Sequence, residues 1–178
     1  ETDQLREKAD KFRTIFDQTF QFVGLLSPDG RVLEANRTAL QLANICEEDI
    51  LQKPFWKTPW WQHSTELQDK LQKSVHEAAQ GNLVRFEATH PDADGNLHYV
   101  DFSLKPFFDR QGQVKFLIPE GRDITGIKEV ALQLKKSESW IKAIVETAVD
   151  GIIVITQTGV VEAFNAAAEM IFGYSAAE

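Results

Sequence analysis

Two stretches of the chain, 129 residues apart, follow the same pattern. Residues 30–49 read GRVLEANRTALQLANICEED, and residues 159–178 read GVVEAFNAAAEMIFGYSAAE. Each has a glycine, a short apolar run with an acidic residue, an asparagine, and then an alanine-rich amphipathic segment. The same offset aligns the helical pattern of residues 140–149 with that of residues 11–20 without a gap. A repeat of this length is a domain with its linker and not a solenoid turn, so we expect one domain and the opening of a second.

Strand and helix patterns alternate after the first helix in an order that defines a fold class. FQFVGLL and RVLEA are apolar runs joined by SPDG, whose Pro and Gly suit a turn, so they predict a hairpin. Asn36 then suits a helix N-cap, and residues 64–80 carry apolar side chains at helical spacing. Three more strands follow, in LVRFEATH, NLHYVDFSLKPFF and VKFLIPEGRDI. This order predicts an α+β domain, a five-stranded antiparallel sheet with helices gathered on one face.

Amphipathic helices flank this domain on both sides. Residues 4–20 place apolar side chains three and four positions apart. After the last strand, four apolar residues recur every seven positions, at Ile127, Leu134, Ile141 and Ala148. Such a seam predicts a two-stranded coiled coil, because a lone helix of this length is marginal in water. We therefore expect a homodimer formed through the flanking helices.

Charge and composition limit the partners and the compartment that we expect. The 178 residues carry a net charge of -8, and an acidic chain repels phosphate backbones, so we expect no nucleic-acid binding. The longest strongly apolar run, residues 151–155, is far too short to span a bilayer, so we expect no direct membrane contact. The single cysteine, Cys46, fits a reducing compartment. The sequence has no signal peptide and no initiating methionine, so we expect a piece of a longer cytoplasmic protein.

Three separated motifs, FVGLLSPDGRVLEANRTAL, PFWKTPWW and PEGRDIT, together resemble a PAS domain of the S-box sensor type. The resemblance covers residues ~12–126, and residues 141–178 resemble the opening of a second PAS domain. It implies the strand order 2-1-5-4-3 and a ligand pocket between the sheet and its helices. We expect an N-terminal amphipathic helix (1–20), a PAS domain (21–126), a coiled-coil linker helix (127–149) and the truncated start of a second PAS domain (150–178).

Strand alternation and helix facing predict which side chains form the walls of this pocket. They are mostly large and apolar: Phe22, Leu25, Leu42, Trp56, Leu67, Leu71, Val84, Phe86, Phe102, Leu104, Phe116 and Ile118. Such side chains either fill the space outright or leave room for a small apolar or aromatic molecule. Both alternatives stay open, and the sequence identifies no cofactor.

Arg122, Asp123, Ile124 and Thr125 lie between the last strand and the linker helix, and they resemble the family's signalling junction. We expect Asp123 to cap the outgoing helix and to tie it to the sheet through Arg122 or Lys105. A shift in the sheet would then rotate the helix. An ordinary N-cap, which stabilises a helix by about 1 kcal/mol, explains the same residue without a signalling role.

Aromatic and sulfur-bearing side chains raise the question of a flavin. Trp56, Trp60 and Trp61 can form a wall for a planar ligand, but tryptophans beside proline more often close one end of a core, with the indole N–H groups bonded to backbone. Cys46 stands in NICEED, which does not match the NCRFLQ stretch of light-oxygen-voltage domains. We expect it to be a small buried or half-buried residue.

The remaining polar candidates indicate no catalytic or metal site. His63 and His76 raise the question of a haem ligand, but a lone histidine does not make a haem site, and we expect both at the surface. Glu87 and Asp101 lie in alternating strands, where an outward polar face explains them. We therefore expect no enzyme activity from this part of the chain.

These expectations combine into a sensory and dimerising module of a bacterial signalling protein. The resemblance favours a sensor histidine kinase of a two-component system, in which a change induced by a ligand or partner passes through the linker helix to a downstream output domain. One alternative is a cofactor-bearing sensor of redox state, gas or light, with flavin or haem. Another is a pure protein-interaction domain with a filled core in a cyclic-dinucleotide enzyme.

Overall fold

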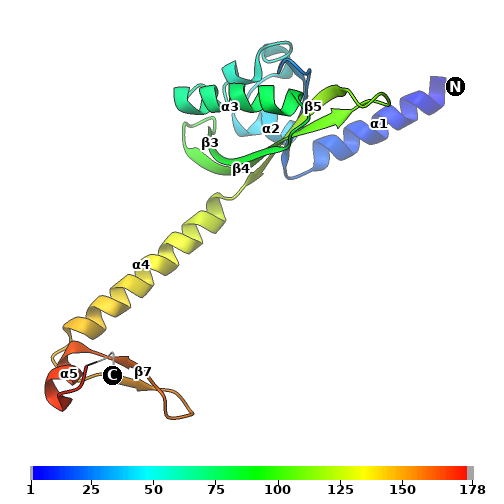
Figure 1. Ribbon diagram of the computed structural model, residues 1–178. Coiled ribbons are helices and arrows are strands. Elements are labelled where there is room, and N and C mark those ends of the chain that lie inside the picture. The colour runs from blue at the N-terminus through cyan, green and yellow to red at the C-terminus, as the bar shows by residue number, and fades with distance from the viewer. Residues whose placement is uncertain (1, 176–178) are drawn as a thin grey trace. The chain divides into compact units, whose positions relative to one another are not determined.

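The computed structural model describes residues 2–175 and divides into two compact units, Glu1–Gly126 and Ile127–Glu178. The first unit holds a five-stranded sheet, and the second holds a two-stranded sheet (Figure 1). Residue 1 of the expected N-terminal helix and residues 176–178 of the expected second domain lie outside the described residues.

The sheet of the first unit is antiparallel and has the strand order β2-β1-β5-β4-β3, as the resemblance implied. Its strands are β1 (Phe22–Leu26), β2 (Val32–Ala35), β3 (Val84–Pro91), β4 (Leu97–Phe108) and β5 (Val114–Asp123). The helices before and between them are α1 (Thr2–Gln18), α2 (Arg37–Leu42), the 3-10 turns η1 (Glu47–Asp49) and η2 (Phe55–Lys57), and α3 (Thr65–Ala79). The helices that follow β2 cover one face of the sheet (Figure 1), so the predicted α+β class is confirmed.

Turn and cap residues determine where these elements begin. Gly30 has a φ of 83° in the β1–β2 turn, a region that glycine adopts without steric cost. A Cβ atom at Gly30 would lie 2.7 Å from Trp56 and 2.8 Å from Val75, so the turn packs directly on η2 and α3. At the start of α3, Ser64 Oγ accepts the Leu67 N–H at 3.2 Å, which is an N-cap.

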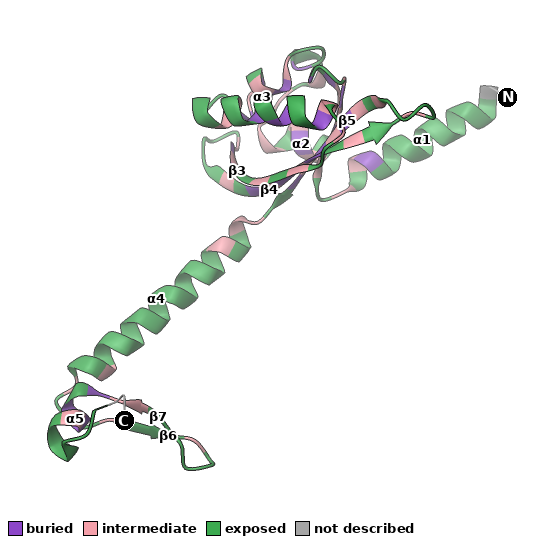
Figure 2. Cartoon of the chain, in the orientation of Figure 1, coloured by how far each residue is buried: buried purple, intermediate pink, exposed green. Residues whose placement is uncertain are grey.

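The core of the first unit lies between the sheet and the helices that follow β2 (Figure 2). In β4 the buried side chains alternate, at Val100, Phe102 and Leu104, and face Leu71 and Val75 of α3 in one cluster. The largest fully buried side chain is Trp61, from the loop between η2 and α3. Burial of large apolar side chains at every second strand position is what holds the helices on this face.

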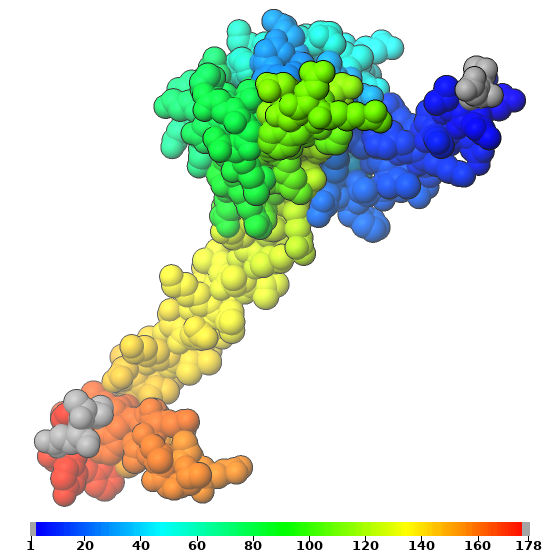
Figure 3. Space-filling model, turned by 45° about the vertical axis from the view of Figure 1, so that its right-hand side comes forward, coloured from blue at the N-terminus to red at the C-terminus, as the bar shows by residue number. Residues whose placement is uncertain are grey.

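The helix α1 contributes little to that core. Phe16 is buried, whereas Leu5, Phe12 and Ile15 are 67%, 58% and 69% exposed. In the space-filling view α1 (blue) projects from the body of the first unit (Figure 3). The apolar stripe of an amphipathic helix is normally covered, so most of this stripe is available to a partner.

The second unit consists of a long helix, a hairpin and a short helix. Its elements are α4 (Thr125–Thr147), which begins at the end of the first unit, β6 (Ile153–Ile155), β7 (Val161–Phe164) and α5 (Ala166–Phe172). The helix we expected over residues 127–149 therefore begins and ends two residues earlier. Ala148, the fourth position of the predicted seam, lies beyond the helix, because the chain turns there toward β6.

The two units repeat one hydrogen-bond pattern around an asparagine. Asn36 Oδ1 accepts the N–H groups of Val23 and Ala39, both at 3.1 Å. Asn165 Oδ1 accepts the N–H groups of Ile152, at 2.8 Å, and Ala168, at 3.0 Å. These two residues lie 129 positions after Val23 and Ala39, as Asn165 does after Asn36. The repeat predicted from the sequence is therefore present in the structure.

The amide nitrogen of the same asparagines ties the end of the preceding helix to the hairpin. Asn36 Nδ2 donates to the carbonyl oxygens of Phe16 in α1, at 3.0 Å, and Gln21, at 2.9 Å. Asn165 Nδ2 does the same to Val145 in α4, at 2.8 Å, and to Asp150, at 3.0 Å. Each asparagine is at most 1% exposed, so water does not compete for these bonds.

Candidate functional site

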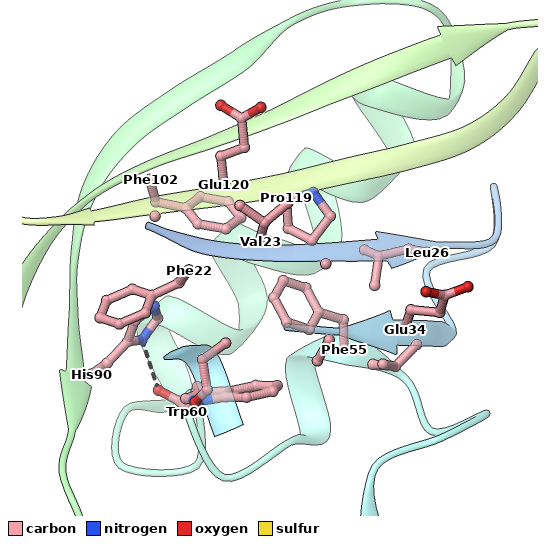
Figure 4. Close-up of a pocket in the computed structure, with 15 residues that line it drawn as sticks. Phe22, Val23, Leu26, Glu34, Phe55, Trp60, His90, Phe102, Pro119 and Glu120 are labelled. Carbon is pink, nitrogen blue, oxygen red and sulfur yellow. Dashed lines mark hydrogen bonds between the residues drawn. The ribbon is translucent and has the colours of Figure 1, made fainter. Parts of the chain in front are cut away.

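A small, mostly apolar cavity lies between the sheet and the segments packed on it (Figure 4). Its apolar walls come from Phe22, Leu26, Val32, Ala39, Phe55, Trp60 and Phe102. Its volume is about 40 Å³, whereas an engineered cavity known to bind benzene has about 150 Å³. A ring-sized ligand, a flavin or a haem would therefore need these side chains to move apart.

His90, in β3, places a buried polar group in the wall of this cavity. It is 5% exposed, and its ring lies edge-on to Trp61 with the centroids 4.7 Å apart. Nδ1 lies 3.0 Å from the carbonyl oxygen of Trp60 (Figure 4). A carbonyl only accepts, so Nδ1 carries the proton and Nε2 keeps its lone pair. Burial lowers the pKa of His90 to about 4, so the ring is neutral at pH 7.

The twelve residues predicted to line the pocket fall into three groups. Phe22 and Phe102 line the cavity itself. Leu71 and Leu104 are buried in the same core, and five others are half-buried against it: Leu42, Trp56, Leu67, Val84 and Phe86. The structure therefore brings these nine residues together around one core.

The other three, Leu25, Phe116 and Ile118, were predicted wrongly, because they lie on the opposite face of the sheet. In β1 the buried positions next to Leu25 are Gly24 and Leu26, and in β5 they are Leu117, Pro119 and Gly121. Successive side chains of a strand point to opposite faces. The partner strand agrees, because Ile118 pairs with the exposed Lys105 and Phe116 with the exposed Phe107.

Sequence reasoning missed several residues of the cavity wall, of which His90 and Phe55 matter most. A signal for His90 was present: strand alternation places it on the same face as Val84 and Phe86. Phe55 lies in a 3-10 turn, where no period applies, so its burial could not be read from the pattern.

Trp60 and Trp61 close the core as predicted, but of these two only Trp60 makes the expected indole bond to backbone among the described residues. Trp60 and Trp61 are 5% and 0% exposed, and Trp60 Nε1 donates to the Ala39 carbonyl at 2.9 Å. Trp61 Nε1 has no hydrogen-bond partner among the described residues. Trp56 is half-buried against the same core and does not line the cavity.

The candidate haem ligands His63 and His76 and the candidate flavin residue Cys46 do not line the cavity. His63 Nε2 is 2.8 Å from Thr89 Oγ1, and His76 Nε2 bonds Gln80 at 3.0 Å, both in exposed positions. Neither histidine lines the cavity. Cys46 is exposed, which corrects the expectation of a buried or half-buried thiol, because it precedes the short turn η1 at the surface.

The candidate carboxylates and metal ligands do not assemble into a reactive site. Asp101 Oδ1 accepts a hydrogen bond from the Arg85 Nε–H group at 2.9 Å on the outer face of the sheet, and Glu87 is exposed on β3. Within residues 2–175, no group of three or more His, Cys, Asp or Glu side chains could hold a metal ion. None of the described helices is both long and apolar enough to cross a membrane.

At the junction of β5 and α4, Asp123 and Thr125 join the helix start to the sheet. Asp123 Oδ1 accepts the Thr125 N–H at 2.9 Å, and Thr125 Oγ1 accepts the Tyr99 N–H of β4 at 2.9 Å. The Ile124 N–H donates to the Tyr99 carbonyl at 2.8 Å. Burial acts to raise the pKa of Asp123, but the hydrogen bonds from Thr125 and His98 outweigh it and hold the pKa below its ordinary value.

The partner of Asp123 is not one of the two basic residues that we expected. Lys105 Nζ pairs with Glu120 at 2.7 Å, and Arg122 is exposed opposite Asp101. Instead His98 Nδ1 lies 2.7 Å from Asp123 Oδ2. Sequence reasoning did not single out His98, because the contact depends on the register of β4 against β5.

The three helical positions of the predicted seam are exposed in this single chain. Ile127, Leu134 and Ile141 are 59%, 60% and 54% exposed, and no described residue of α4 is buried. Figure 2 shows the helix exposed along nearly its whole length.

Comparison with known proteins identifies two family matches along the chain. The PAS fold model matches residues 16–129, and a PAS domain model matches residues 139–178. The HTR-like protein of Haloarcula marismortui has a PAS domain whose crystal structure aligns with a TM-score of 0.57 at 19% identity. That alignment covers 69% of this chain and 97% of the other, and at this identity it shows the fold alone.

Two curated relatives are histidine kinases. The sensor histidine kinase TmoS of Ectopseudomonas mendocina is 43% identical over 130 residues, 71% of this chain. The hybrid signal transduction histidine kinase D of Dictyostelium discoideum is 33% identical over 136 residues, 75% of this chain. The aligned part spans 13% and 9% of the lengths of these two relatives.

Proposed function

The chain belongs to the PAS family, and on this basis we propose that its first unit is the sensory module of a sensor histidine kinase in a two-component system. PAS domains are normally not catalytic, and the described residues hold no metal cluster or reactive constellation of carboxylates. The kinase activity belongs to an output domain elsewhere in the longer protein. A reducing compartment such as the bacterial cytoplasm suits the exposed Cys46.

The observation that carries this proposal is the direct bonding of the helix start to the sheet. Thr125, the first residue of α4, bonds both Asp123 of β5 and Tyr99 of β4. A change in the position of these central strands moves the groups that hold the helix. A ligand can shift this equilibrium only by binding the two states with different affinities.

The cavity is the site where such a ligand would act. Its walls include residues of β1, β4 and β5. The strands β4 and β5 also carry the junction, with Tyr99 near the start of β4 and Asp123 as the last residue of β5. The apolar lining suits a small apolar or aromatic molecule, which must push the side chains apart to enter. Denaturing extraction followed by mass spectrometry should recover such a molecule, and its absence would favour the filled core of a protein-interaction domain.

The output passes, in this proposal, through a parallel pair of α4 helices in a homodimer. The exposed apolar positions Ile127, Leu134 and Ile141 form the seam, because a helix of this length is marginal alone in water. The double substitution Leu134→Glu with Ile141→Glu places four carboxylates in the seam of a dimer. We expect it to convert the dimer into a monomer in sedimentation, with the first unit still folded by circular dichroism.

The matched control places the same two glutamates off the seam. Lys136→Glu with Ala143→Glu changes exposed positions of the same helix and should leave the dimer intact. A dimer that survives the seam substitution, or a wild-type chain that sediments as a monomer, would refute the coiled-coil relay.

A further inference from the structure

His98 lies between two carboxylates at the junction of the sheet with α4. Its Nδ1 is 2.7 Å from Asp123 Oδ2, and its Nε2 is 3.3 Å from Asp92 Oδ2. An ionised carboxylate only accepts hydrogen bonds, so both ring nitrogens must donate. A histidine with two N–H groups is an imidazolium, so both contacts are hydrogen bonds only when His98 is protonated.

The electrostatics of the junction agree with this geometry. The hydrogen bond to Asp123 is the largest cause that raises the pKa of His98 above its ordinary value, burial opposes it, and Asp92 adds to the increase. Hydrogen bonds from Asn96, together with the one from His98, hold the pKa of Asp92 below its ordinary value. Both carboxylates are therefore ionised wherever His98 titrates.

The two carboxylates organise different parts of the first unit. Asp92 Oδ1 accepts the N–H groups of Asp94, at 2.9 Å, and Asn96, at 2.8 Å, and so builds the turn between β3 and β4. Asp123 Oδ1 holds the N–H of Thr125, where α4 begins. The imidazolium of His98 thus joins the β3–β4 turn to the start of the helix.

The other titratable group next to His98 does not compete for the proton. His90, its directly paired residue in β3, is bonded to Trp60, and burial keeps its pKa at about 4. Asp101 and Arg122 sit one position along their strands from Val100 and Asp123, and so they face the other side of the sheet. Among the described residues, Asp123 and Asp92 are thus the charged groups that act on His98, and His90 lies beside it on the same face.

We propose that His98 is a proton-dependent latch on the start of α4. When His98 is protonated it holds Asp123, and through Asp123 it holds Thr125, in the observed arrangement. As pH rises and His98 loses a proton, one ring nitrogen faces a carboxylate with a lone pair instead of an N–H group. One of the two hydrogen bonds of His98 to Asp123 and Asp92 then breaks, and the junction loosens. The latch makes pH a second input to the junction, and only this signalling consequence rests on the proposed function.

Nuclear magnetic resonance on the whole chain tests the latch directly. The ring resonances of His98 and the amide resonances of Tyr99 and Thr125 are followed from pH 5 to 9 (a range spanning the ordinary pKa of histidine, about 6.5). We expect His98 to titrate above this value and both amides to follow with the same midpoint. Amides that stay unchanged while His98 titrates, or a His98 midpoint at or below the ordinary value, would overturn the proposal.

Three variants separate the latch from a structural role. His98→Gln should abolish the titration of the Thr125 amide, and Asp92→Asn should lower the His98 midpoint by about one pH unit, because a nearby negative charge is removed. The control substitution His76→Gln, on the exposed face of α3, should leave the titrations of the His98 ring and of the Thr125 amide unchanged. If the Thr125 amide still titrates in His98→Gln, the latch is wrong, while the dimer measured by sedimentation is unaffected and the proposed function stands.

Discussion

Replacing Asn36 with alanine tests whether one buried side chain holds the start of the first unit together. Its Oδ1 accepts the N–H groups of Val23 and Ala39, and its two amide N–H groups face the carbonyl oxygens of Phe16 and Gln21. The side chain is 0% exposed, so water cannot replace these bonds without rearrangement. The substitution thus removes partners from the end of α1, from β1 and from the N-terminus of α2.

The expected cost follows from the number of bonds lost. Oδ1 accepts two hydrogen bonds, and the two N–H groups of Nδ2 share three acceptors, because Thr19 Oγ1 also lies 3.0 Å away. Counted as four donated or accepted N–H groups at a net value of about 1 kcal/mol each, they amount to about 4 kcal/mol, including the N-cap of α2. Total stabilities of domains are typically about 5–15 kcal/mol, so this is a large fraction. For a domain of this size, about 4 kcal/mol corresponds to a fall of roughly 15 °C in Tm.

Urea unfolding followed by tryptophan fluorescence measures this cost in the first unit. Trp60 and Trp61 are buried there, whereas Trp140 in α4 is 68% exposed and should change little. Asn82→Ala, at an exposed position of the same unit, is the matched control, and we expect it to change the free energy of unfolding by less than about 0.5 kcal/mol. If Asn36→Ala costs no more than this control, the bonds of Asn36 do not hold the fold and the reasoning fails.

Two further substitutions probe the turn and the buried histidine. Gly30→Ala should lower the free energy of unfolding by about 2 kcal/mol more than Gly95→Ala in the same urea assay. Both glycines have a positive φ, but only a Cβ atom at position 30 meets Trp56 and Val75. Equal losses of stability in the two variants would contradict the packing of the turn. His90 has a pKa of about 4 in the fold, whereas its ordinary value is 6.5. Between these two pH values the unfolded chain is protonated at His90 and the folded chain is not. The free energy of unfolding therefore falls by about 1.4 kcal/mol for each pH unit as pH drops through this interval. The difference in stability between wild type and His90→Phe, measured from pH 7 to pH 4, should show this slope, and a flat difference would mean that His90 is not neutral in the fold.

The sequence predicts the inward face of a strand only where polar residues mark the outward one. In β4, Asp101, Ser103 and Lys105 alternate with Phe102 and Leu104, and those two were placed correctly. In β5, residues 116–118 are all apolar, and the next inward positions hold Pro119 and Gly121. The flanking charges give conflicting signals, because alternation places Lys115 on the face of Leu117, whereas it places Glu120 on the face of Phe116 and Ile118. Phe116 and Ile118 were therefore assigned to the core, which is wrong. The contrast between neighbours, not the hydrophobicity of a residue, carries the information.

Contacts between strands distant in sequence are a second limit. His98 meets Asp123 across 25 residues and Asp92 across 6 residues. The register that pairs Val100 with Asp123 brings these three side chains to one corner of the sheet. A shift of one residue in that register would turn Asp123 to the other face. The DIT motif therefore predicts that the junction exists, whereas its partner can be identified only from the folded sheet.

The repeat separates what local sequence determines from what the whole sheet supplies. Asn36 and Asn165 make the same bonds to residues within about 20 positions of themselves, so the helix, hairpin and cap form from the local pattern alone in both units. Leu26 and Ile155 are equivalent positions in the two hairpins, yet Leu26 is 1% exposed and Ile155 is 58% exposed. The difference arises because β5 pairs with β1 beside Leu26, and Leu26 packs in the core that the following helices close. Since the cavity also depends on β3, β4 and β5, the ligand response that we propose would require these long-range elements, while the asparagine hairpin attaches the preceding helix in both units.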